Sequence, residues 1–445
     1  MQGKSVLVVG TKRSGMGAVE LLVRAGARVR AMDAETPDAE QMTRLKELAI
    51  PVLPQAAENI GGVELIVLSP AVPWDLPMFA AARERGIPVI GEVELASYFL
   101  RGPVIGITGS NGKTTTTALT GHLLKESGIS CQVGGNIGKA PTAMVETSRP
   151  EQWNVLELSS FQLESIEHFR AQIGACLNVT PDHLDRHHTF EIYARAKGRL
   201  FDTQTMEDHA VLNYDDETCR HFGGTAKSKV FWFSSAREVP NGMWLAGGSL
   251  LFNGERVMER SRIRLRGLHN VENVMAAALI AHVAGAEWPV IARGIETFSG
   301  VEHRIEFVRE VNGVQYFNDS KATNVDAALK AVDAFEEPLW IILGGKGKGG
   351  SYEPLVVPLH KKAKGALLIG AEPPYPYAAA PLLAKALQDA VPVVNCGSLR
   401  AAVEYAHQHA TAGDVVLLAP ACASFDQFQS YEQRGAEFKH FVQVL

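Results

Sequence analysis

Short apolar runs rich in β-branched residues alternate with segments of helical periodicity along most of the chain. Runs such as Val104–Thr108 and Val415–Leu418 contain no charged residue, which is typical of strands buried on both faces of a sheet. Parallel strands require long crossover connections, and the helical segments between the runs supply them. The pattern predicts an α/β fold with several mostly parallel sheets. The other predicted strands are Lys4–Val9, Arg28–Met32, Leu65–Leu68, Val155–Leu158, Cys176–Val179, Trp340–Leu343 and Ala366–Ile369.

Two breaks in this pattern mark predicted domain boundaries. After the helical segment Glu92–Leu100, the sequence Arg101-Gly102-Pro103 introduces a new strand, and an alanine-rich helical region ends near Ser299. A hairpin over Val308–Phe317, with Asn312-Gly313 as its turn, follows the second break. A length of 445 residues corresponds to two to four domains at about 100–200 residues each. We therefore expect domains at residues 1–97, 98–300 and 301–445.

The composition is 46% hydrophobic and 21% charged, with a formal net charge of −6 and mixed signs along the chain. This balance gives no support for a nucleic-acid interface or a polybasic membrane patch. Five cysteines without a C-x-x-C pair indicate reduced thiols. The chain starts on a strand instead of a signal segment, and its most apolar helical stretch, Val274–Ala284, is too short to span a bilayer. We expect a cytoplasmic protein without membrane insertion, and nothing in the sequence requires more than a monomer.

A glycine-rich segment, 109–114 (GSNGKT), lies between the strand Val104–Thr108 and a predicted helix over Thr115–Lys125. Such a turn lets backbone N–H groups and the helix N-terminus converge on phosphate oxygens. Lys113 would reach the β- and γ-phosphates of ATP, and the Thr114 hydroxyl would bind Mg²⁺. Ile107 occupies the first glycine position of the strict motif. The strand–turn–helix context nevertheless favours a nucleotide site over a plain surface turn.

Polar residues also occur at the ends of the next two predicted strands. Glu157 is a lone carboxylate in the apolar run Val155–Leu158, near the strand end where parallel sheets bind ligands. Alone it suits a salt bridge as well as a metal, but beside a phosphate loop the Mg²⁺ role is favoured. His183, His187 and His188 match no structural zinc spacing and have no cysteine among them. A polar loop with one functional histidine is the favoured interpretation.

The N-terminal strand is followed by a partial dinucleotide fingerprint over Gly10–Gly17. Asp33 ends the next strand, about 20 residues downstream, where dinucleotide folds place an acidic residue on a ribose. Lys12 replaces the middle glycine, which would let the backbone approach a pyrophosphate. The segment therefore indicates a Rossmann-like unit and only weakly a nicotinamide site.

Longer motifs resemble the Mur ligase family over essentially the whole chain. They are TGSNGKT (108–114), GGNIG (134–138), LELSSFQL (156–163), NVTPDHLDR (178–186), YARAK (193–197) and LHNVEN (268–273). The C-terminal motifs NDSKATN (318–324), ACASFDQF (421–428) and EQRGAEF (432–438) are similar to those of the members that add D-glutamate. The D-N-P-R signature of the members that add L-lysine or diaminopimelate is absent, and Asn111 stands where the L-alanine-adding member has a histidine. Lys346 and Tyr431 replace an aspartate and a phenylalanine found in some members.

This resemblance implies a Rossmann-like N-terminal domain, a central P-loop ATPase-type domain with a mostly parallel sheet, and a Rossmann-like C-terminal domain. The implied reaction is the ATP-dependent addition of D-glutamate to UDP-N-acetylmuramoyl-L-alanine through an acyl phosphate, in peptidoglycan precursor synthesis. ATP and two Mg²⁺ ions are the implied cofactors, and Lys197 is the residue that the family carbamylates. Arg304, in the third domain, is implied to contact the γ-phosphate after domain closure.

The same resemblance implies a set of site residues. The UDP substrate would contact Arg13, Ser14, Asp33, Ser69, Asn136 and His183. ATP would contact Gly109, Ser110, Asn111, Gly112, Lys113, Thr114, Thr115, Asn270, Asn273, Arg304 and Asp319. D-glutamate would contact Lys321, Thr323, Lys348, Ser424, Phe425 and Tyr431. Lys113, Glu157, His183 and Lys197 are the implied catalytic residues, and the implied metal ligands are Thr114, Glu157, His183 and carbamylated Lys197.

Several of these residues also have simpler explanations, and three other functions stay open. Ser14 also suits a helix cap, Asp33 a surface charge, and the lysines 197, 321 and 348 solvated surface positions. A folylpolyglutamate-type ligase would lack the N-terminal domain that holds UDP. A P-loop switch or ATP-driven binding protein would need no amino-acid site, and a nicotinamide oxidoreductase would show cofactor absorbance.

Overall fold

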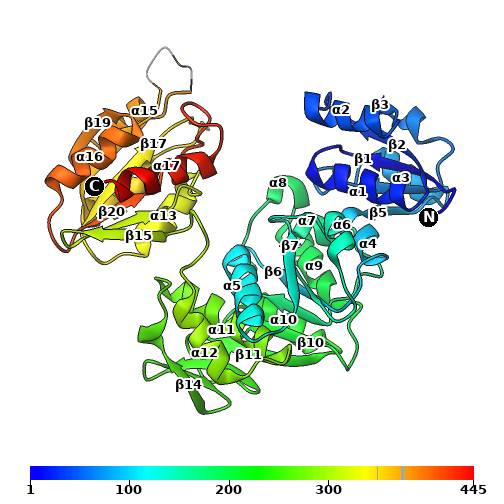
Figure 1. Cartoon of the computed structure of the whole chain (residues 1–445), viewed down its shortest axis with the longest axis horizontal. Coiled ribbons are helices and arrows are strands. Elements are labelled where there is room, and N and C mark those ends of the chain that lie inside the picture. The colour runs from blue at the N-terminus through cyan, green and yellow to red at the C-terminus, as the bar shows by residue number, and fades with distance from the viewer. Residues whose placement is uncertain (348, 372–374, 376) are drawn as a thin grey trace. The chain divides into compact units, whose positions relative to one another are not determined.

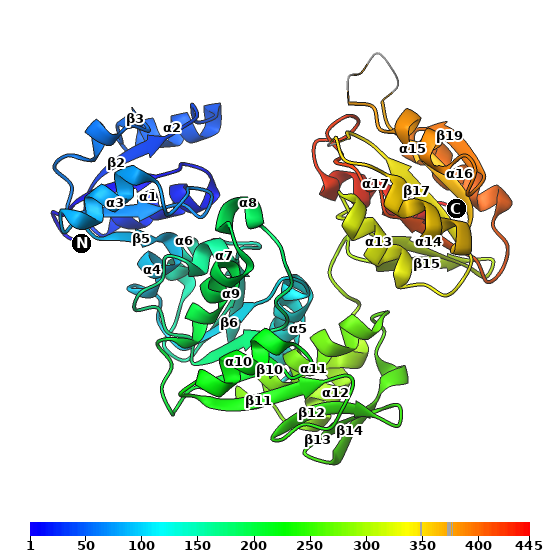
Figure 2. The ribbon, with the colours of Figure 1, turned by 180° about the vertical axis from the view of Figure 1, so that it is seen from behind.

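The computed structural model describes residues 1–347, 349–371, 375 and 377–445. The chain forms three sheets in two compact units, which comprise residues 1–263 with 269–298, and residues 264–268 with 299–445. The first two sheets belong to the first unit and the third sheet to the second (Figure 1; Figure 2). Among the helices described, none is long and apolar enough to cross a membrane.

The first sheet holds five parallel strands in the order β3-β2-β1-β4-β5. The strand order reverses at β1, and folds of this type bind ligands at the carboxyl ends of the strands there. Thr11 follows β1, Asp33 ends β2 and Ser69 follows β4, so these polar residues lie at that edge. The elements are β1 (Ser5–Val9), α1 (Arg13–Arg24), β2 (Arg28–Asp33), α2 (Ala39–Glu47), β3 (Val52–Pro54), a 3₁₀ turn (Ala57–Ile60), β4 (Leu65–Leu68), α3 (Pro77–Glu84), β5 (Val89–Gly91) and α4 (Glu92–Ser97).

The second sheet has nine strands in the order β14-β13-β12-β11-β10-β9-β6-β8-β7, parallel except at the β12–β13 and β13–β14 pairs. The phosphate loop follows β6, which lies between β9 and β8, and Ile107 of β6 pairs with Glu157 of β8. Its strands are β6 (Val104–Thr108), β7 (Cys131–Gly135), β8 (Trp153–Glu157), β9 (Ile173–Cys176), β10 (His209–Asn213), β11 (Lys229–Ser234), β12 (Gly242–Ala246), β13 (Ser249–Phe252) and β14 (Glu255–Glu259). Its helices are α5 (Lys113–Glu126), α6 (Pro141–Met144), α7 (Ser160–Leu163), α8 (Leu184–His187), α9 (Phe190–Gly198), α10 (Glu217–Thr225), α11 (Leu268–Val283) and α12 (Trp288–Thr297), with 3₁₀ turns at Val145–Thr147, Arg199–Phe201 and Arg260–Arg262.

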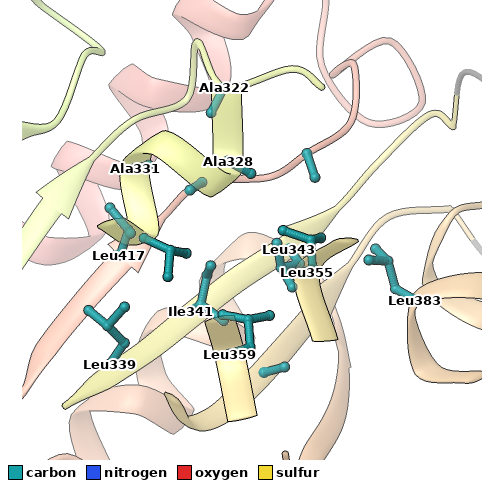
Figure 3. Close-up of a cluster of buried hydrophobic side chains, with 14 of the residues drawn as sticks. Ala322, Ala328, Ala331, Leu339, Ile341, Leu343, Leu355, Leu359, Leu383 and Leu417 are labelled. Atoms are coloured by element: carbon teal, nitrogen blue, oxygen red, sulfur yellow. The ribbon is translucent and has the colours of Figure 1, made fainter. Parts of the chain in front are cut away.

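The third sheet has six strands in the order β15-β16-β20-β17-β18-β19, with only the β15–β16 hairpin antiparallel. One face buries Ile341 and Leu417 under Ala331 of α13 and Leu359 of α14 (Figure 3). The other face is covered by α16 and α17, so its strands are buried on both sides and read as continuous apolar runs. The elements are β15 (Glu306–Val311), β16 (Val314–Asn318), α13 (Val325–Asp333), β17 (Leu339–Gly344), a 3₁₀ turn (Glu353–Leu355), α14 (Val356–Lys362), β18 (Ala363–Ile369), α15 (Ala380–Leu387), β19 (Val393–Gly397), α16 (Leu399–His409), β20 (Val415–Leu418) and α17 (Tyr431–Gln443).

The α/β class and the predicted hairpin are confirmed, and eight of the nine predicted strands coincide with β1, β2, β4, β6, β8, β17, β18 and β20. The prediction of a strand over Cys176–Val179 was wrong, because β9 ends at Cys176. Leu177 and Val179 are buried in the following loop, where the Val179 N–H donates to the Asp216 carboxylate. Apolar residues thus continue past the strand end. The boundaries near residues 97 and 300 fall between sheets and stay predictions.

Glu94 fastens the helix α4 to the loop before β9. Its buried carboxylate accepts N–H groups of Glu167 (2.8 Å), His168 (2.8 Å) and Phe169 (2.9 Å), together with the Tyr98 hydroxyl (2.9 Å). One side chain therefore satisfies several backbone donors that have no helix or strand to bond them.

We predict that Glu94→Ala lowers the free energy of unfolding by about 2–4 kcal/mol, because it leaves these donors unsatisfied. Urea unfolding followed by circular dichroism measures the loss. Glu84→Ala, at an exposed position of α3, is the matched control. A change no larger than that of the control would contradict the assignment.

Candidate active site

The phosphate loop between β6 and α5 is fixed by glycine conformation and by hydrogen bonds from neighbouring loops. Gly112 caps α5 at φ +84°, and a Cβ there would collide with the Asn273 amide. The Ser110 N–H donates to the Asn178 carbonyl (2.9 Å). The Ser110 hydroxyl donates to the Thr180 carbonyl (2.9 Å) and lies 2.8 Å from the Tyr193 hydroxyl. These hydrogen bonds fix the conformation of the loop. The N-terminus of α5, which directly follows it, can serve as an anion site.

Two lysine amines meet at one carbonyl of this loop. Lys113 Nζ donates to the carbonyls of Gly109 (2.8 Å) and Ser110 (3.0 Å), and Lys197 Nζ also donates to the Gly109 carbonyl (2.8 Å). Lys197 is only 1% exposed. Burial, and then the charge of Lys113, lowers the pKa of Lys197 to about 7. A neutral amine, the form to which CO₂ adds, is therefore well populated near neutral pH.

Glu157 presents an unsatisfied oxygen beside the loop. It is 2% exposed at the end of β8, and its Oε1 accepts from Asn136 Nδ2 (3.0 Å). The other carboxylate oxygen, Oε2, is buried without a hydrogen-bond partner among the residues described. An unpaired buried carboxylate oxygen is unfavourable unless a cation approaches it. Together with the buried Thr114 hydroxyl, this donor set fits a hard divalent cation such as Mg²⁺.

The three histidines after β9 have different polar partners, although His183 and His187 both contact the Phe161 ring. His183 adopts φ +53° before α8 and is half exposed, with its ring 4.9 Å from that of Phe161. His187 is buried with Nε2 2.9 Å from the Ser160 hydroxyl, and burial lowers its pKa to about 4. His188 Nε2 lies 3.2 Å from Asp75. Within the described ranges, no three His, Cys, Asp or Glu side chains gather in a group that could hold a metal ion. His187 did not emerge as a site residue from the sequence.

The N-terminus of α11 reaches the start of α5. Asn273 Nδ2 donates to Asn270 Oδ1 (3.0 Å), and the Thr116 hydroxyl donates to Asn273 Oδ1 (3.4 Å). The structure thus brings these two predicted ATP residues to the phosphate loop, whereas Thr115 is a half-buried residue of the first turn of α5.

In the first sheet, Asp33 and Ser69 lie at the predicted ligand edge. Asp33 accepts the N–H and hydroxyl of Thr11 (both 2.6 Å). Burial raises the pKa of Asp33, but the Thr11 hydrogen bonds outweigh it, so the net pKa is lowered and the group is a carboxylate. Arg13 Nη2 donates to the Asn136 carbonyl (3.1 Å), while Ser14 lies in the first turn of α1. Thr11 is a further candidate contact that only the structure indicates.

Arg186 joins the central sheet to the loop that carries Ser69. Its guanidinium donates to the Val72 carbonyl (2.9 Å) and pairs with Glu164. Arg186 stands in the NVTPDHLDR segment, which was the available signal, yet no role was expected for it. We assign it to holding the loop 69–72.

In the second unit, Arg304 and Asp319 lie at the entrance to β15 and the exit of β16. His303 (φ +63°) and Ile305 (φ +43°) flank Arg304 in left-handed conformations, which are strained for a β-branched residue. Burial raises the pKa of Asp319 to about 7, although the Arg304 charge and the Ile305 N–H act in the opposite direction. From this strained turn the exposed Arg304 places its charge near the buried Asp319 carboxylate.

The predicted D-glutamate residues that the structure describes occupy three segments of the second unit. Lys321 Nζ lies 5.5 Å from the centre of the Tyr431 ring, and the Thr323 N–H donates to the Lys321 carbonyl (2.8 Å). Ser424 is buried, whereas Phe425 is 65% exposed. Lys348 lies outside the described residues.

Lys346 is fastened beside these segments. Its N–H donates to the Ala423 carbonyl (2.9 Å), its carbonyl accepts the Ala423 N–H (3.1 Å), and its ammonium lies 5.1 Å from the Tyr377 ring centre. Lys346 stands where some members have an aspartate. Its backbone is fixed by the two hydrogen bonds to Ala423, while its ammonium group lies near an aromatic ring.

Comparison with known proteins covers the whole chain. Residues 4–91 match the Mur ligase MurD-like N-terminal domain, 107–281 the Mur ligase middle domain, and 303–422 the glutamate ligase domain of Mur ligases. The UDP-N-acetylmuramoylalanine--D-glutamate ligase of Solibacter usitatus is 55% identical over 445 residues, covering 100% of this chain and 99% of the relative. That of Koribacter versatilis is 46% identical over 454 residues, covering 100% and 98%. The chain belongs to the Mur ligase family.

Solved structures confirm the fold of this Mur ligase. The UDP-N-acetylmuramate-alanine ligase MurC of Thermotoga maritima aligns with a TM-score of 0.60 at 20% identity, covering 99% of each chain. MurF ligase of Thermotoga maritima, determined in complex with ADP, aligns with a TM-score of 0.58 at 17% identity, covering 100% of this chain and 96% of that one. The three predicted α/β domains, two of them Rossmann-like around a P-loop domain, are thereby confirmed.

We predict that Lys197→Met stabilises the first unit of this Mur ligase at pH 6 by about 2–5 kcal/mol, because it removes an unfavourable buried charge. The folded pKa of Lys197 is lowered, so its penalty is complete below about pH 7 and disappears as the pH rises toward the unfolded value of about 10.5. The gain should therefore shrink between pH 7 and pH 10, while ligase activity is lost at every pH.

Urea unfolding in CO₂-free buffers at pH 6, 7.5 and 9 measures this effect. Lys125→Met, at an exposed position of α5, is the control and should show little pH dependence. Destabilisation by Lys197→Met, or a gain that does not change with pH, would contradict the assignment of a depressed pKa.

Proposed function

We propose that this Mur ligase is the ATP-dependent enzyme that joins D-glutamate to UDP-N-acetylmuramoyl-L-alanine in peptidoglycan precursor synthesis. The observation that carries the proposal is the 55% identity, over the full chain, to a relative named UDP-N-acetylmuramoylalanine--D-glutamate ligase. Mur ligases use ATP, and the structure provides a phosphate loop with lysine at the expected position. The phosphate loop therefore supports the use of ATP, and the full-length identity supports the choice of substrates.

The reaction needs an activated carboxylate, because a free carboxylate does not condense with an amine in water. An oxygen of the L-alanyl carboxylate attacks the γ-phosphorus of ATP, and ADP leaves. The deprotonated D-glutamate amine then attacks the carbonyl carbon of the acyl phosphate, and the tetrahedral intermediate expels inorganic phosphate. Phosphoryl transfer of this kind depends mainly on positioning and on neutralisation of charge.

The chain's own residues would meet these needs at the phosphate loop. Lys113 would exchange its loop carbonyls for phosphate oxygens, and the N–H groups of 112–115 at the start of α5 would bind the same anions. Asn270 and Asn273, at the start of α11, would contact the nucleotide, as would Arg304 and Asp319 of the second unit. Mg²⁺, when bound, neutralises developing charge on the phosphates; Thr114, Glu157 and His183 would hold it with carbamylated Lys197.

The other two substrates would occupy the remaining clusters. The UDP part of the substrate would bind at the edge of the first sheet, where the Asp33 carboxylate can accept a hydrogen bond from a ribose hydroxyl or a uracil N–H. The residues proposed to contact it are Arg13, Ser14, Asp33, Ser69 and Asn136. Lys321, Thr323, Lys348, Ser424, Phe425 and Tyr431 would receive D-glutamate, whose two carboxylates suit cationic and hydroxyl donors.

We predict that phosphate release from ATP requires both UDP-N-acetylmuramoyl-L-alanine and D-glutamate. The purified chain is assayed with each substrate omitted in turn, and with L-glutamate, L-alanine or diaminopimelate in place of D-glutamate. Release confined to the complete D-glutamate reaction is the expected result. Release with another amino acid would overturn the substrate assignment, and release without either substrate would favour an ATP-driven switch.

We also predict that Glu157→Gln raises the Mg²⁺ concentration for half-maximal activity by about tenfold or more, because an amide is a weaker ligand than a carboxylate. The steady-state rate is measured against free Mg²⁺ at saturating substrates. Glu151→Gln, at an exposed position before β8, is the control. An unchanged Mg²⁺ requirement would show that Glu157 does not act on the metal.

A further inference from the structure

The second unit buries an arginine that the proposed mechanism does not use. Arg434 of α17 is 0% exposed and is among the largest fully buried side chains of the residues described. Its Nε donates to the Ser320 hydroxyl (3.0 Å), Nη2 to the Ser320 carbonyl (2.8 Å) and Nη1 to the Cys422 carbonyl (3.2 Å). All three acceptors are neutral, and no ion pair of Arg434 occurs among the described residues. Burial lowers the pKa of Arg434 to about 10, and the group still carries its charge at neutral pH.

The three acceptors connect the segments that carry the proposed D-glutamate residues. Ser320 directly precedes Lys321, and its hydroxyl also donates to the Tyr431 carbonyl (2.8 Å). Cys422 lies two residues before Ser424. Tyr431 is one helical turn before Arg434 on α17, on the same side of the helix. One planar guanidinium therefore holds the loop after β16 and the loop after β20 against the start of α17.

A fourth segment also packs against this guanidinium. Gly345 has φ +126°, and a Cβ on it would lie 3.4 Å from Arg434 Nη1 and would collide with the Ala423 carbonyl. Lys346, the next residue, is bonded through its backbone to Ala423. The loop that leads from β17 thus approaches the other three at the same point, and only glycine allows this approach.

Stability alone does not account for a charged side chain here. Burial penalises the Arg434 charge through lost hydration, and the Asp426 charge offsets this only in part. Apolar replacements of buried ionic groups are often neutral or stabilising. The guanidinium has a rigid fork of donors that can bond several backbone segments at once, which lysine or an apolar residue cannot do. Its positive charge, which the nearby Asp426 carboxylate offsets only in part, also raises the affinity of the surrounding segments for anions.

We propose that Arg434 is a positioning residue for the amino-acid substrate: it fixes the segments of Lys321, Ser424 and Tyr431 together and favours a dicarboxylate beside them. This inference rests on the proposed D-glutamate ligase function. Arg434 acts through Ser320 and Cys422, so its own side chain need not touch the substrate.

The test is a comparison of Michaelis constants in Arg434→Met, Arg434→Lys and the wild-type chain, with all three substrates varied in turn. Arg434→Met should raise the KM for D-glutamate by about tenfold or more, with those for ATP and the UDP substrate within about twofold. Arg434→Lys keeps the charge but loses the fork, so its KM for D-glutamate should fall between those of Arg434→Met and the wild type. Arg400→Met, which removes an exposed arginine of the same unit, is the matched control.

Folding is checked by thermal denaturation, and if Arg434→Met does not fold, Arg434→Lys and Ser320→Ala must show the selective rise instead. An unchanged KM for D-glutamate, or an equal rise for all three substrates, would overturn the inference. If the wild-type chain shows no D-glutamate-dependent phosphate release, the proposed function fails and this inference fails with it. Wild-type activity with a normal KM in the folded variants overturns the inference alone.

Discussion

The arrangement of the central site depends on one buried contact. In it the Lys197 amine donates a hydrogen bond to the Gly109 carbonyl. It places a poorly solvated amine on the first residue of the phosphate loop, where Lys113 donates to the same oxygen. The parallel pairing of β6 with β8 then sets Glu157 beside that loop. On the side of α11, the Asn273 amide packs so closely against Gly112 that a larger residue would not fit there. A fixed backbone thus holds two lysine amines that repel one another close to a carboxylate and an amide that have lost hydration.

Three buried ionisable groups lie at strand ends: Glu157 ends β8, the Lys197 amine bonds the residue after β6, and Asp319 follows β16. All three side chains are buried. Among the described residues, none of them forms a salt bridge that would neutralise its charge. The burial of Lys197 and Asp319 weakens the fold, since desolvation disfavours the charged form of each. Groups of this kind are typical of sites where ligands supply the missing charge. The proposed reaction brings phosphates, a divalent cation and two carboxylates, which are the charges that these residues would complement.

Much of this arrangement was predictable from the sequence because its signals are local. Strands buried on both faces produce uninterrupted apolar runs, and the run Val104–Thr108 followed by GSNGKT identified the phosphate loop directly. The β12–β14 meander was not predicted, because β12 and β13 are short and β14 mixes apolar and charged residues at a sheet edge. The strand end after β9 was misplaced because the following loop is buried as well. Thr11, His187 and Arg434 acquire meaning only through partners distant in sequence, which no local pattern encodes.

The central claim is that the site phosphorylates a substrate carboxylate before the amide forms. The most direct measurement uses UDP-N-acetylmuramoyl-L-alanine labelled with ¹⁸O in its L-alanyl carboxylate, turned over with ATP and D-glutamate. An acyl phosphate transfers one labelled oxygen to the released phosphate, which mass spectrometry detects. Phosphate that carries one ¹⁸O is the predicted result. Unlabelled phosphate, formed while the amide product accumulates, would contradict activation through an acyl phosphate.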